Sequence, residues 1–292
     1  MTELPRPAPA HGRRRKHILP GFGLTLGFSI FYLTGLILLP LLALALRTVT
    51  PTADYPTVGA VVGHVWQTVT AARAVATYQL SFGLSFAAAL IDGFFGLIAA
   101  WALTRYQFPG RKIADALVDL PFAMPTSVAG LALTQMFAPN GGWLGRYVPA
   151  AYTAWGILIA LVFVGFPFVV RTLQPVMASL RIEAEEAAAC LGANRWQIFR
   201  RVLLPALRPA MITGAMLAFG RAVGEYGSVV FISGGNMPYR TEITPHLIII
   251  RLEEFDYAGA AGLGLVMLLV SFAIVVTVNL VQHFTAPRGR TA

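Results

Sequence analysis

Two charged residues interrupt a long apolar stretch in the last third of the chain. Arg221 and Glu225 are four residues apart, and on an α-helix this spacing places both side chains on one face. A charge near the centre of a bilayer costs at least about 2.5 to 3.5 kcal/mol, so both side chains should face protein or water. Two interpretations stay open. The pair could lock two helices together, or Arg221 could lend positive potential to the path of an anion while Glu225 orients its guanidinium.

Other polar residues also lie within apolar stretches. Asp92 would be a buried carboxyl that is protonated or hydrogen-bonded to a neighbouring helix. Pro121 and Pro125 predict a kink, and the hydroxyls that follow them, or water, would pair with the freed carbonyl groups. Broken helices often lie beside transport sites, but a kink with a packing role is equally compatible. The residues predicted to line a translocation path or gate are Arg221, Glu225, Thr126 and Ser127.

The remaining reactive residue types are too few or too scattered to build an enzyme. Cys190 is the single cysteine, which excludes an intramolecular disulfide and a thiolate cluster. The sequence contains no Gly-x-x-x-x-Gly-Lys-Ser/Thr phosphate loop. We therefore expect no catalytic site, no metal site and no cofactor bound by this chain. The five histidines are dispersed, at His11, His17, His64, His246 and His283.

The composition predicts a membrane protein. Hydrophobic residues make up 57% of the 292 residues and charged residues only 12%, with a mean hydropathy of +0.68. A spanning helix needs about 20 mainly apolar residues, and the apolar runs lack the alternation of barrel strands. We therefore predict an all-α, polytopic membrane bundle with six transmembrane helices. The six stretches are roughly Gly21 to Leu46, Thr77 to Thr104, Leu117 to Phe137, Tyr152 to Val170, Pro209 to Gly234 and Ala258 to Gln282.

The distribution of Lys and Arg predicts the orientation. With a cytoplasmic N-terminus, sixteen of these residues fall in inner segments and five in outer ones, so both termini are expected in the cytoplasm. The net charge of +9 is then a matter of topology, and we expect no nucleic-acid partner. The first apolar stretch is too long for a signal peptide and is expected to be retained. We divide the chain into a basic tail at 1–18 near anionic membrane lipid, a membrane domain at 19–286 and a tail at 287–292.

A long segment at about 183–205 connects the fourth and fifth stretches. Acidic residues at its start suit the N-terminus of a helix that Gly192 would end. Asn194 would cap a second helix, with Pro205 near its end. We expect two short helices along the inner membrane surface, and an ordinary amphipathic connector would have the same pattern.

The spacing within this segment is more specific. Glu186-Ala187-Ala188, then Gly192, then Val202-x-Leu204-Pro205 resembles the EAA loop of permeases in ATP-binding-cassette importers. The resemblance implies the type I importer permease fold and a coupling helix that docks into a groove on a separate ATPase subunit. It assigns contact and turn positions to Glu185, Glu186, Ala187, Ala188, Gly192 and Arg195.

Further stretches, at 103–111, 119–123, 168–176 and 251–257, resemble the T-type permease of sulfate/thiosulfate importers in the bacterial inner membrane. That family implies a heterodimer with a W-type permease, two ATPase subunits that bind ATP and Mg, and a periplasmic sulfate-binding protein. Molybdate permeases share the EAA loop and a segment like Gly224–Gly227, so molybdate or another oxyanion is the alternative substrate. An ion-coupled secondary transporter and a membrane enzyme are less compatible with the pattern.

Overall fold

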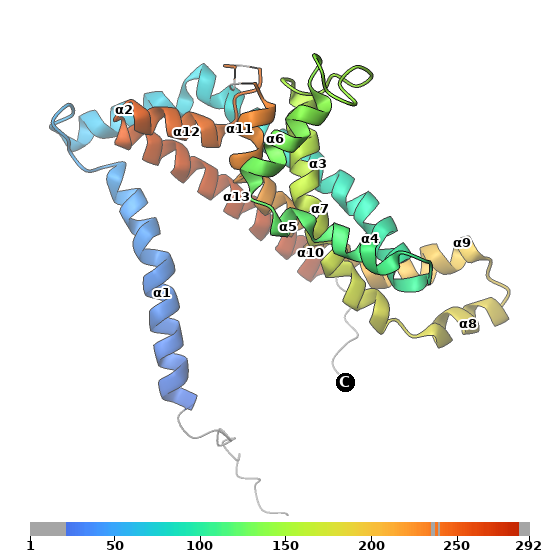
Figure 1. Ribbon diagram of the computed structural model, residues 1–292. Coiled ribbons are helices and arrows are strands. Elements are labelled where there is room, and N and C mark those ends of the chain that lie inside the picture. The colour runs from blue at the N-terminus through green and yellow to red at the C-terminus, as the bar shows by residue number, and fades with distance from the viewer. Residues whose placement is uncertain (1–21, 235–236, 239, 286–292) are drawn as a thin grey trace, which may run out of the picture. The chain divides into compact units, whose positions relative to one another are not determined.

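The computed structural model describes residues 22–234, 237, 238 and 240–285, with side chains to Gln282. All regular structure in these residues is helical, which confirms the predicted all-α class (Figure 1). Contacts divide the chain into two units, Met1–Leu46 and Arg47–Ala292. The helices are α1 (Phe22–Arg47), α2 (Val58–Thr70), α3 (Ala72–Arg105), α4 (Arg111–Val118), α5 (Leu120–Ala123), α6 (Thr126–Phe137), α7 (Ala154–Ser179), α8 (Ile182–Cys190), α9 (Arg195–Ile198), the π-helical turn η1 (Phe199–Leu203), α10 (Leu204–Val223), α11 (Gly227–Ile232), α12 (Thr244–Glu253) and α13 (Tyr257–Thr285).

The first unit is represented by α1, which is apolar on every side. None of its residues is buried, and large side chains such as Leu24 and Phe31 are strongly exposed. This helix of 26 residues carries its one charge, Arg47, in its last turn, and it is long enough to cross the hydrocarbon of a bilayer. Its surface therefore requires lipid or another protein around it.

The core of the second unit lies where α3, α7 and α10 pack together. α7 is mainly apolar and contributes fully buried residues such as Val169 and Leu173, while Leu207 comes from α10. Small residues let the backbones approach closely. A Cβ at Gly96 would lie 2.7 Å from the Val169 side chain, and a Cβ at Gly214 would lie 3.0 Å from the Val169 Cα.

The third predicted span is not one helix. It is divided into α5 and α6 at Met124 and Pro125, both of which have extended backbone. Pro125 lacks a backbone donor and forces Met124 out of the helical region, so the kink that we predicted is a complete break. Five continuous helices in the described residues are long and apolar enough to span, where the sequence predicted six.

The predicted end of the helix after Asn194 is also wrong. Helix α9 continues through η1 into α10, so it runs without interruption past Pro205. In η1 the Leu204 N–H bonds to the Phe199 carbonyl, five residues back. This wider turn accommodates a proline whose missing donor would otherwise break an α-helix.

Two short peripheral groups of helices lie at opposite ends of the second unit, with α2 and α12 at one end and α8 and α9 at the other (Figure 1). Near α12, the Arg73 guanidinium forms two hydrogen bonds with the buried Glu242 carboxylate, at 2.7 and 2.5 Å. The Thr244 N–H donates to the Ser81 hydroxyl at 2.9 Å, which satisfies a donor at the start of α12. These bonds fix α12 against α3.

Gly130 provides a test of the contact between α6 and α11. A Cβ at this position would overlap the Ser228 backbone, whereas a Cβ at Gly83 on α3 would meet nothing within 4 Å. We expect Gly130→Ala to destabilise the chain by about 1 to 3 kcal/mol through overpacking. Gly83→Ala is the matched control and should be neutral or slightly stabilising because alanine favours helix. Thermal unfolding in detergent measures both, and equal transition temperatures would contradict the close packing.

Candidate functional site

The predicted turn and cap after α8 are confirmed. Gly192 has φ +83°, a conformation that favours glycine, and its N–H bonds to the Ala189 carbonyl. The Asn194 side chain accepts a hydrogen bond from the Gln197 N–H at 2.9 Å, and the Gln197 side chain accepts one from the Asn194 N–H at 2.8 Å. This reciprocal capping box starts α9. The connection between α8 and α9 is therefore a defined structure.

Side chains from α3 and η1 hold α8 and α9 in place. Arg105, in the last turn of α3, forms an ion pair of 2.7 Å with Glu185 on α8. The Arg105 guanidinium also lies 5.6 Å from the centre of the Trp101 ring. Trp101 meets Phe199 edge-on at 5.9 Å between ring centres, and Phe199 stacks on Trp196 of α9. Any movement of α8 and α9 is thus coupled to the end of a spanning helix.

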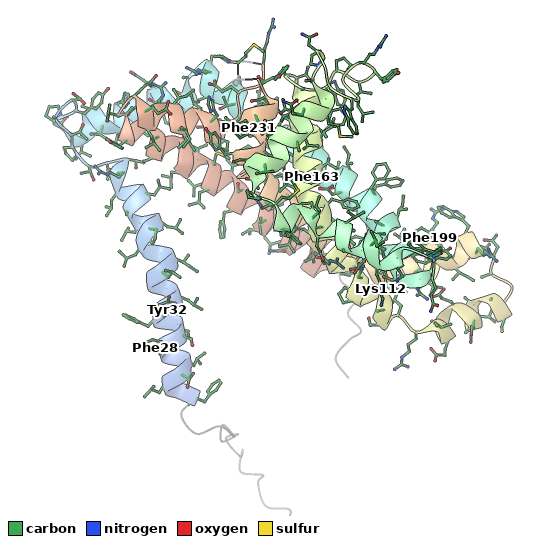
Figure 2. All side chains as sticks on the ribbon, viewed as in Figure 1. Phe28, Tyr32, Lys112, Phe163, Phe199 and Phe231 are labelled. Atoms are coloured by element: carbon green, nitrogen blue, oxygen red, sulfur yellow. The ribbon has the colours of Figure 1, made fainter. Side chains whose placement is uncertain are left out.

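The predicted coupling residues fall into two groups. Glu185 is half-buried against Arg105, and Ala188 is also half-buried. The others face outward, and Figure 2 shows this end of the unit near the labelled Phe199. The exposed members are Glu186, Ala187, Gly192 and Arg195. The structure therefore separates a carboxylate that is held by this chain from residues that remain open to a partner.

Leu191 is a residue that the sequence analysis missed. Its side chain is 89% exposed at the end of α8, next to the glycine turn. A leucine that projects so far from the surface has no packing role inside the chain. A large apolar residue directly before the turn glycine was the available signal.

The ion pair between Arg221 and Glu225 forms as predicted. Arg221 Nη1 lies 2.6 Å from Glu225 Oε2. However, Glu225 lies beyond the end of α10, in the break before α11. Its other oxygen, Oε1, accepts hydrogen bonds from the Ser228 N–H at 2.9 Å and the Ser228 hydroxyl at 3.1 Å. Glu225 is 2% exposed, so it pairs a donor at the start of α11 and orients the more exposed Arg221.

The two helix breaks lie beside each other. A Cβ at Gly227, the first residue of α11, would overlap the Thr126 hydroxyl and lie 3.3 Å from the Ser127 N atom. Ser127 is exposed and Thr126 is half-buried. The two predicted path segments, that of Arg221 and Glu225 and that of Thr126 and Ser127, therefore meet at Gly227. The coupling residues on α8 form a separate site.

Helix α12 also reaches this region, which the sequence did not indicate. The His246 ring of α12 stacks on Tyr226 in the break before α11, with 6.0 Å between ring centres. Burial lowers the pKa of His246 below its usual value, which favours a neutral ring at pH 7. The stack connects α12 to the residue that follows Glu225.

Asp92 is fully buried on α3. Both of its carboxylate oxygens lack a hydrogen-bond partner among the described residues, and Oδ2 lies against Gly165 on α7, where a Cβ would collide with it. The expected hydrogen bond to a neighbouring helix is not formed in this conformation. In the described part of the chain no group of three or more His, Cys, Asp or Glu residues could hold a metal ion.

Comparisons with known proteins agree with this architecture. Residues 93–291 match the family model of binding-protein-dependent transport system inner membrane components. The chain is 47% identical over 264 residues to the sulfate transport system permease protein CysT of Synechococcus elongatus, with 89% of this chain and 91% of that protein covered. It is 44% identical to CysT of Escherichia coli K12, with 91% and 94% covered.

A solved structure has the same fold. The bacterial ABC transporter involved in import of the acidic polysaccharide alginate superposes with a TM-score of 0.73 over 91% of this chain and 96% of that chain, at 16% identity. The relatives are transport permeases, so this chain is a multi-pass transport subunit and not an enzyme. It belongs to the binding-protein-dependent inner membrane components, and within them to the CysT-type permeases of ATP-binding-cassette importers.

Proposed function

We propose that this permease moves sulfate or thiosulfate into the cell, driven by ATP hydrolysis on a separate ATPase subunit to which α8 couples. The names of the CysT relatives support the substrate. The observation that carries the coupling role is that α8 has an exposed surface and an ion pair to a spanning helix. The ion pair joins Glu185 on α8 to Arg105 at the end of α3. Force applied to α8 would therefore be transmitted into the membrane core.

The partners follow from the exposed surfaces and from the family. The unburied apolar surface of α1 supports contact with a second, W-type permease in a heterodimer. The two ATPase subunits that bind ATP and Mg follow from the family alone. The excess of Lys and Arg in the segments assigned to the inner side supports a cytoplasmic location for α8 and both termini. A periplasmic sulfate-binding protein would then approach the opposite end, which carries α2 and α12.

The adjacent helix breaks are the proposed translocation path. The interruption between α5 and α6 and that between α10 and α11 lie side by side, and Arg221 lies next to them with its guanidinium partly exposed. Glu225 holds that guanidinium in place while its own charge is shared with Ser228. An anion would thus meet a guanidinium that is already oriented. This reduces the free-energy cost of transferring the anion out of water.

Transport in sealed vesicles tests the substrate. The full transporter, with its binding protein outside and ATP on the ATPase side, should accumulate labelled sulfate. Thiosulfate should compete, and uptake should stop without ATP. A transporter that hydrolyses ATP and accumulates molybdate but not sulfate would overturn the sulfate assignment and leave the importer architecture intact.

Leu191 tests the coupling surface. We expect Leu191→Asp to weaken association with the ATPase subunit by at least about thirtyfold, because a buried interface anchor typically contributes about 2 kcal/mol or more. Leu191→Met, which keeps size and polarity, should retain binding. Co-purification and sulfate uptake measure the effect. Wild-type assembly by Leu191→Asp would show that this side chain does not enter the partner.

Arg221 tests the path. Arg221→Gln should lower the rate of sulfate uptake about tenfold or more, because loss of one oriented charge-assisted contact costs about 1.5 to 3 kcal/mol. Assembly with the ATPase should be unchanged. Arg221→Lys, which keeps the charge, is the control and should retain more activity. If both variants transport at the wild-type rate, the ion pair has only a structural role.

A further inference from the structure

A cavity of about 530 Å³ is lined by charged, polar and apolar residues that belong to neither site described above. Its walls come from the last turn of α3, the first half of α4 and the end of α7. Because α3 and α7 are both long enough to span the bilayer, a cavity between their ends lies at a membrane surface. Figure 2 shows the labelled Lys112 at the same end of the unit as Phe199.

The carboxylates near the cavity are already paired with α7. Arg171 donates from Nε to Asp119 Oδ1 at 2.7 Å and from Nη1 to Asp115 Oδ1 at 2.8 Å. Gln174 also donates to Asp115 Oδ1, at 2.9 Å. The hydrogen bonds from Gln174 and Arg171 lower the pKa of Asp115, so this carboxyl stays ionised at neutral pH. One oxygen of Asp115 is therefore engaged by two donors on α7.

Two further cations line the cavity and form no salt bridge within 4.0 Å among the described residues. They are Arg111 and Lys112, the first two residues of α4, and the charge of Arg111 also helps to lower the pKa of Asp115. Together, the three cations Arg111, Lys112 and Arg171 and the two carboxylates Asp115 and Asp119 give a net charge of one positive unit around the cavity. Gly110 provides no side-chain cap for α4, so the positive end of this helix adds to that potential.

The other side of α4 is apolar and exposed. Ile113 is 68% and Leu117 is 60% exposed, and they are four residues apart on one face. Tyr106 and Phe108, in the turn that leads to α4, are exposed as well. Aromatic residues and an amphipathic helix of this kind are typical of the boundary between headgroups and acyl chains.

We propose that this cavity binds the phosphate of an anionic glycerophospholipid. Arg111 and Lys112 contact the phosphate oxygens, and the Thr104 hydroxyl in the cavity wall is a further donor. The acyl chains lie along Ile113 and Leu117. A free tetrahedral oxyanion such as sulfate would meet the same cations, but it would leave the apolar face uncovered, and this favours the lipid.

Lipid binding to the full chain tests this proposal. The delipidated protein is titrated in detergent with phosphatidylglycerol, phosphatidylcholine or inorganic sulfate, and bound lipid is counted by native mass spectrometry. Phosphatidylglycerol should bind most tightly. The double variant Arg111→Gln/Lys112→Gln should bind it about thirtyfold more weakly, because each basic residue near an anionic lipid contributes about 1 kcal/mol. A double variant with wild-type affinity would overturn the site.

Matched variants separate this site from general surface charge. Arg200→Gln/Arg201→Gln removes two exposed cations of η1 and should leave the affinity unchanged. Ala178→Trp keeps both cations but fills the cavity, so it should also weaken phosphatidylglycerol binding. Equal losses in the Arg200/Arg201 variant would refute a localised site. Displacement of the lipid by millimolar sulfate would instead assign the cavity to a free oxyanion.

Discussion

Every backbone N–H and C=O group inside hydrocarbon must find a partner within the protein, and this constraint shapes the whole chain. Most of the chain meets it with continuous helices. The two interruptions occur together, where α5 meets α6 and α10 meets α11. At the second of these, the Glu225 carboxylate replaces a backbone acceptor by binding the Ser228 N–H. Irregular backbone is thus stable here because a buried side chain provides the missing bond.

The Glu225 carboxylate also stabilises the charge of Arg221. Glu225 is shared between Ser228 and Arg221, so neither the helix end nor the guanidinium is left without a partner. The Tyr226–His246 stack connects this arrangement to α12, which Arg73 and Ser81 fix against α3. A displacement of α12 would therefore affect Arg221 and Glu225 through direct contacts. At the other end, the pair of Arg105 and Glu185 links α8 to the same α3.

Local patterns predicted some features of the site well. The turn at Gly192 and the cap at Asn194 depend on residues within a few positions of each other, so their chemistry is visible in the sequence. The continuation past Pro205 was not predictable in this way, because it depends on a wide turn that tertiary packing selects. The ion pair of Glu185 was also not predictable from local pattern. Its partner Arg105 is distant in sequence and on a different helix.

The sequence by itself determined that this protein lies in a membrane, that it is helical and where its helix-breaking residues are. These features are local, because they depend on the length of each apolar stretch and on the chemistry of proline. Tertiary structure alone decided which breaks lie together, which carboxylates are occupied and which surfaces stay open. Arg111 and Arg171 look alike as isolated basic residues. Both line the same cavity, but only Arg171 forms salt bridges to two aspartates, because ion pairing depends on distances between helices that no local pattern specifies.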